Sequence, residues 1–181
     1  MKRAAIRRGQ REREKVNKNK SAMGVWMRAE QAGQRNGMVI SLCTVIDSLY
    51  TDYNWSDKQI NDFTDNLTDH MLKGSPQIIE FAVKPWQERL LEQINEQGKV
   101  NMKVNSLEKK IEYENRNNSY VSYCGYMLLN LYSNFNLGQK KLKTLIDQCT
   151  KSFMLMMKVP EEYTNEKCLE KTKKLTGLDI L

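Results

Sequence analysis

The chain has 181 residues, of which 40% are hydrophobic and 28% charged, so it can bury one sizeable core or two small ones. Nine glycines and three prolines stand against abundant Lys, Glu, Gln, Leu and Met, which favours an all-α protein, because strands need more β-branched residues and turn glycines. The apolar runs fall short of the roughly 20 residues that span a bilayer, and no apolar signal segment follows Met1. These features predict a cytoplasmic protein without a membrane partner.

The net charge of +7 lies entirely in the first 21 residues. Nine basic residues there outnumber two acidic ones, and the other 160 residues carry 20 charges of each sign. Apart from Met1, only Ile6 and Val16 are large and apolar in residues 1–21, so we expect a disordered arm, or one that becomes helical only on binding. The basic residues of this arm are Lys2, Arg3, Arg7, Arg8, Arg11, Arg13, Lys15, Lys18 and Lys20.

Residues 22–74 form the first predicted helical unit. The glycines at positions 33 and 37 indicate a break, after which apolar residues recur at helical spacing up to a turn at Asn54 and Trp55. Ser56 and Gln59 then form a capping-box pattern, which predicts the start of a second helix. The buried stripe of that helix should comprise Ile60, Phe63, Leu67 and Met71.

Residues 75–116 are predicted to be linking helices. Pro76 and Pro85 each suit the first position of a helix, because proline lacks the amide hydrogen that is unused there. A further polar helix is expected over Val104–Tyr113.

Residues 117–181 repeat the first unit and add a C-terminal helix. A shift of 82 positions aligns residues 36–72 with 118–154 without a gap and with eight identities. We interpret this match as an internal duplication of a helix hairpin, in preference to a chance likeness of two amphipathic helix pairs. Gly138 takes the place of the capping serine, and a last helix should run from about Thr164 to Gly177.

The fold prediction is therefore an all-α helical bundle. Two homologous helix-hairpin units are joined by the linking helices into one compact domain, which follows the disordered basic arm.

No set of residues in the sequence identifies a reaction. His70 is the one histidine, and Asp65 with Asp69 on its predicted helix provides two carboxylates, too few for a metal site. No glycine-rich phosphate loop is present. The cysteines lie far apart, mostly at apolar helical positions, which is typical of reduced, buried thiols: Cys43, Cys124, Cys149 and Cys168. We expect a protein that is not an enzyme and has no metal or cofactor.

The charge pattern supports two functions. Arg and Lys at the density of the arm can neutralise phosphates, which favours DNA or RNA binding, although the arm has no aromatic residue for base stacking. A basic arm can also dock on an acidic protein surface. Residues 35–72 carry a net charge of −4 and residues 117–154 one of +3. Units of opposite charge can face one another or present different surfaces to partners, and simple sequence drift accounts for the difference equally well. The candidate protein-contact residues of the second unit are Lys140, Lys141, Lys143, Tyr120 and Tyr123.

Several segments resemble small uncharacterised proteins of Firmicute phages and prophages. They are the opening Met1-Lys2-Arg3-Ala4 with Arg7-Arg8, the turn Asp52-Tyr53-Asn54-Trp55 with Lys58 on the next helix, and the closing residues 169–180. The resemblance covers the arm and one helical unit at a time; it implies a phage or mobile-element origin and no particular activity. The alternative function is then a phage anti-defence or host-takeover protein in the bacterial cytoplasm, which binds and inhibits or redirects a host protein through its helical body.

Overall fold

The computed structural model describes residues 2–73, 76–97 and 106–178, with side chains for 22–68, 82–97 and 106–178. These ranges form six helices and no strand, which confirms the all-α prediction. None of the described helices is long and apolar enough to cross a membrane. The helices are α1 (Lys2–Tyr53), α2 (Asp57–Lys73), α3 (Pro76–Glu96), α4 (Leu107–Ser133), α5 (Gln139–Lys158) and α6 (Asn165–Thr176).

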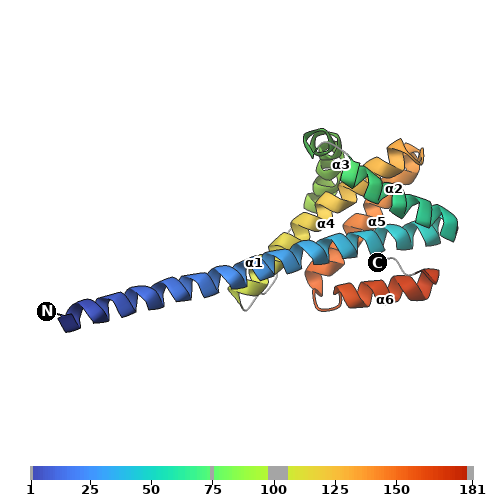
Figure 1. Cartoon of the computed structure of the whole chain (residues 1–181). Helices are drawn as coiled ribbons and strands as arrows, with labels where there is room; N and C mark the ends of the chain where they lie inside the picture. The colour runs from blue at the N-terminus through green and yellow to red at the C-terminus, as the bar shows by residue number, and fades with distance from the viewer. Residues whose placement is uncertain (1, 74–75, 98–105, 179–181) are drawn as a thin grey trace.

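α1 is a single helix of 52 residues whose N-terminal part extends away from the other helices (Figure 1). The predicted disorder of the basic arm is not confirmed, because the backbone of residues 2–21 is helical and continuous with the rest of α1.

Gly33 and Gly37 lie inside α1 at its crossing with α4. A Cβ atom added to Gly33 would lie 2.2 Å from the carbonyl oxygen of Glu112, and one added to Gly37 would lie 2.2 Å from that of Arg116. The two backbones are so close that no side chain fits between them. The predicted helix break at these glycines is wrong, because a glycine in a helical pattern can mark either a stop or a close backbone approach, and only the partner helix distinguishes the two.

α1 and α4 lie side by side and run in the same direction (Figure 1). Gly33 faces Asn115, and one turn further along both helices Gly37 faces Ser119. Each of these contacts joins residues 82 positions apart in the sequence.

Two predicted helix boundaries also differ from the structure. α3 contains Pro85 as an internal residue, where the sequence predicts the start of a new helix. α4 begins after Ser106, whose hydroxyl accepts a hydrogen bond from the Lys109 amide at 3.2 Å. It continues past Tyr113, where the sequence predicts the end of a separate linking helix, and through the polar stretch 114–119. This stretch packs against the glycines of α1, and such tertiary contacts override weak helix propensity.

The α1–α2 and α4–α5 turns share one backbone conformation. Asn54 and Asn136 are the non-glycine residues of the described chain with positive φ, at 53° and 51°. The amide of the following residue, Trp55 or Leu137, donates to a carbonyl six residues earlier, at 3.0 Å in the first turn and 2.9 Å in the second. Both of these apolar residues are buried, so each turn folds back over its hairpin.

The predicted starts of α2 and α6 are confirmed by their capping hydrogen bonds. The Ser56 amide donates to Gln59 Oε1 at 3.0 Å, and the Gln59 amide donates to Ser56 Oγ at 3.4 Å. Gly138 begins α5 without a side-chain cap. α6 starts at Thr164, whose hydroxyl accepts from a backbone amide, and ends at Gly177 with a φ of 76°.

The core is formed by apolar residues from every helix except α6. Ile60, Phe63 and Leu67 are buried as predicted, whereas Met71 lies outside the described side chains. α3, from the first half of the chain, packs on α4, and α6, from the second half, packs on α1. Each half of the chain therefore covers the long helix of the other half.

Candidate functional site

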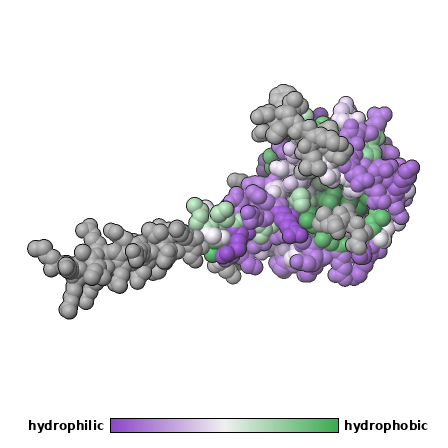
Figure 2. Space-filling view, in the orientation of Figure 1, coloured by the Kyte–Doolittle hydropathy of each residue, from purple (hydrophilic) through white to green (hydrophobic). Residues whose placement is uncertain are grey.

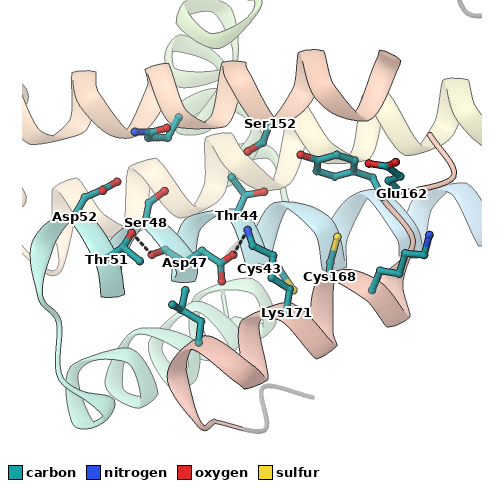
Figure 3. Close-up of a pocket in the computed structure, with 14 residues that line it drawn as sticks. Cys43, Thr44, Asp47, Ser48, Thr51, Asp52, Ser152, Glu162, Cys168 and Lys171 are labelled. Carbon is teal, nitrogen blue, oxygen red and sulfur yellow. Dashed lines mark hydrogen bonds and ion pairs between the residues drawn. The ribbon is translucent and has the colours of Figure 1, made fainter. Parts of the chain in front are cut away.

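A polar cavity of about 560 Å³ lies between α1, α5 and α6 (Figure 3). α1 contributes Cys43, Asp47 and Thr51, which are four residues apart and therefore share one helix face. α6 contributes Cys168 and Lys171 from the opposite wall.

Asp47 is the hydrogen-bonding centre of this cavity. Its carboxylate accepts from Lys171 Nζ at 2.9 Å and from the hydroxyl of the fully buried Thr172 at 2.6 Å. Figure 3 shows Asp47 between Thr51 and Lys171. The hydrogen bond from Lys171 to this carboxylate raises the pKa of the lysine. Both carboxylate oxygens accept hydrogen bonds from residues of α6, so Asp47 links the last helix to the first.

The two thiols of the cavity are poor nucleophiles. Burial raises the pKa of Cys43 to about 12 and that of Cys168 to about 11. The thiolate is the form that attacks substrates and binds metals, and almost none forms near neutral pH at these values. Together with Cys124 and Cys149 these cysteines are free, and all but the half-buried Cys168 are buried, as the sequence predicts.

The acidic residues do not assemble a metal site in the described part of the chain. Among side chains with a described position, no group of three His, Cys, Asp or Glu residues could hold a metal ion. Asp65 is exposed on α2, while the side chains of Asp69 and His70 lie outside the described ones.

Arg116 is a buried charge that the sequence places in a predicted linker. It is 2% exposed, and its guanidinium lies 4.5 Å from the ring centroid of Tyr113 and donates to the Met156 carbonyl at 3.4 Å. Burial lowers the pKa of Arg116. Arg116 therefore takes part in two contacts of α4. Its backbone lies against the glycines of α1, and its side chain bonds α5.

The predicted protein-contact lysines are on the surface. Lys140, Lys141 and Lys143 are all exposed in the first turns of α5. The ammonium of Lys141 lies 5.7 Å from the ring centroid of Tyr53 at the end of α1.

The two predicted contact tyrosines differ from each other in burial. Tyr123 is half-buried and packs beside Tyr126, with ring centroids 6.3 Å apart. Tyr120 is fully buried, and its hydroxyl donates to the Cys149 carbonyl at 3.0 Å. Tyr120 is therefore a core residue and is unavailable to a partner, because α4 turns it towards α5.

The predicted nucleic-acid contacts occupy the first 20 positions of α1. Their side chains lie outside the described ones, but the helical backbone fixes their order along the helix. Positions 3, 7, 11, 15 and 18, all Arg or Lys, follow each other at three- or four-residue intervals and so lie along one side of the helix.

Trp26 follows the arm on the same helix and was not singled out as a functional residue from the sequence. It is 52% exposed, and Met23 and Met27 beside it are 63% and 54% exposed. Figure 2 shows pale and light-green surface where the body meets the arm. The aromatic residue was visible in the sequence, but the predicted disorder of residues 1–21 concealed that Trp26 and the arm share one helix.

No protein-family model, curated protein or solved structure matches this chain. The charge distribution and the geometry therefore carry the functional argument.

Proposed function

We propose that the protein binds DNA or RNA without catalysing a reaction, through the basic N-terminal part of α1. The observation that carries this proposal is the separation of charge. Residues 1–21 hold the whole net charge of +7, and α1 carries this segment away from a body that is neutral overall (Figure 1). A cationic segment held clear of the body attracts a polyanion and releases its bound counterions.

The helical backbone of the arm suits such a contact. A helix of 20 residues is about 30 Å long, and the major groove of DNA admits an α-helix. A row of basic positions along one side of this helix can follow phosphates over that length.

The test neutralises part of the arm in the full-length chain. Substituting Arg3, Arg7, Arg8 and Arg11 by Gln should weaken binding to both DNA and RNA. It should also reduce the slope of log affinity against log salt by about 3, because each phosphate contact contributes about 0.7 to 0.9. Fluorescence anisotropy over a salt series measures both effects.

The matched control removes the same charge from the body. The exposed lysines Lys58, Lys109, Lys151 and Lys158 are substituted by Gln and should leave the salt slope almost unchanged. Equal losses in the two variants would show that net charge alone governs binding. If the arm variant instead captures the same single host protein as the unmodified chain, the alternative of a phage host-takeover protein becomes the better account.

The two hairpins are further proposed to derive from one ancestral unit. The two turns have matching φ angles at equivalent asparagines, and the contacts Gly33–Asn115 and Gly37–Ser119 have the 82-residue offset of the sequence repeat. When two equivalent helices pack side by side in the same direction about a twofold axis, each residue of one helix lies against the equivalent residue of the other. Such packing gives contacts with the offset of the repeat. These observations support the duplication, and the phage origin stays a prediction.

A further inference from the structure

Trp26 exposes a flat aromatic surface directly after the basic arm. It is 52% exposed, whereas Trp55 and Trp86 are only 9% and 8% exposed. Met23, one turn earlier, and Met27, the next residue, extend the exposed apolar surface along the helix. A cluster of this kind, unlike a single exposed apolar residue, marks a contact surface.

The charge around this cluster favours a polyanion as its occupant. Residues 15–30 contain four basic residues, Lys15, Lys18, Lys20 and Arg28, against one acidic residue, the exposed Glu30 one turn after Trp26. A second copy of the chain docking here would bring two arms of net charge +7 together, which like-charge repulsion opposes. Nucleic acid supplies phosphates for the cations and aromatic faces for the indole.

The chemistry of stacking distinguishes paired from unpaired bases. In a duplex the base faces are covered by neighbouring base pairs, whereas in single strands and loops they are open to an aromatic side chain. The arm has no aromatic residue and so cannot by itself prefer unpaired bases. α1, however, places Trp26 on the same continuous helix as the arm.

We infer that Trp26 is a base-stacking site, on which an unpaired base of single-stranded DNA or RNA lies while the arm holds the flanking phosphates. This inference rests on the proposed function and narrows it to unpaired nucleic acid. Met23, three positions before Trp26 and exposed on the same side of the helix, can flank the stacked base.

Tryptophan fluorescence of the full-length chain tests the inference, because Trp55 and Trp86 are buried and the response of Trp26 stands out. Oligo(dT) should quench the emission saturably. Trp26→Ala should weaken oligo(dT) binding roughly 5- to 150-fold, leave the affinity for a blunt DNA duplex of equal length unchanged, and abolish the quenching. Trp26→Phe should keep most of the affinity. The control Leu155→Ala removes an apolar side chain that is 47% exposed on α5, and it should change neither affinity.

Three results would overturn the inference. If oligo(dT) binding depends on the arm but is unchanged in Trp26→Ala, stacking is wrong while the proposed function stands. If the unmodified chain binds neither oligo(dT) nor the duplex, both are wrong. If the Trp26 emission shifts with protein concentration alone, a second copy covers the patch and stacking is again wrong.

Discussion

Cys43 and Cys168 make the stability of the protein dependent on pH in the alkaline range. Burial raises the pKa of these thiols from 9.0 to about 12 and about 11. The folded chain therefore keeps protons that the unfolded chain releases above pH 9, and the free energy of unfolding must fall as pH rises through that window.

The expected contribution of Cys43 can be isolated by substitution. Between pH 9 and pH 11 the free energy of unfolding of the unmodified chain should fall by about 2 kcal/mol more than that of Cys43→Ala, since one unit of pKa shift corresponds to about 1.4 kcal/mol. Urea unfolding at a series of pH values measures both free energies of unfolding. Below pH 8 the gap between them should no longer change with pH. Thr51→Ala, which lines the same cavity without a titrating group, should keep the slope of the unmodified chain.

Residues that act on their immediate neighbours were predictable from sequence, and residues with distant partners were not. Ser56 with Gln59, and Gly177 at the end of α6, act within a few positions, so their patterns identified them. Asp47 bonds Thr172, 125 positions away, and Tyr120 bonds Cys149, 29 positions away. No spacing in the sequence indicates which of these polar groups is buried and which is exposed.

At the scale of the elements, the crossing of α1 and α4 reverses the usual effect of a glycine-to-alanine substitution. Alanine in a helix interior normally stabilises by about 1 kcal/mol relative to glycine. At Gly33 and Gly37, however, the added Cβ atom would lie 2.2 Å from a carbonyl oxygen of α4, so the helices would have to separate.

We expect Gly33→Ala and Gly37→Ala each to lower the free energy of unfolding by about 1–3 kcal/mol, the usual cost of overpacking. Gly24→Ala is the matched control on the same helix, because no atom lies within 4 Å of its added Cβ, and it should stabilise by up to about 1 kcal/mol. Chemical denaturation measures all three. Stabilisation in every variant would show that the crossing is looser than the structure indicates.

The same crossing explains which elements could not be located from sequence. Apolar periodicity predicted the hairpin helices and their turns, because each carries its own buried stripe. The sequence predicts a break at Gly33 and Gly37, a helix end at Tyr113 and a helix start at Pro85, whereas all of these positions lie inside helices. A glycine or proline in a helical pattern is ambiguous on local sequence alone. The predicted disorder of residues 1–21 had a functional consequence, because it hid that Trp26 and the basic arm form one helix.

At the scale of the whole molecule, the two halves of the chain are interlocked. α3 of the first half packs on α4, α6 of the second half packs on α1, and the α1–α4 contact joins the halves along their long helices. Neither half can bury its own apolar faces, since each long helix is covered mainly by the other half. The cooperative folding unit should therefore be the assembled pair of halves.

A split protein tests this. Fragments 1–101 and 102–181, expressed together, should copurify as a one-to-one complex that unfolds in a single transition, because the cut spares all six described helices. The midpoint of that transition should rise with protein concentration, as expected when association stabilises the folded state. A cut between residues 119 and 120, inside the α1–α4 crossing, is the control and should prevent assembly. Cooperative unfolding of fragment 1–101 alone would contradict the interlocked arrangement, and circular dichroism with size-exclusion chromatography distinguishes these outcomes.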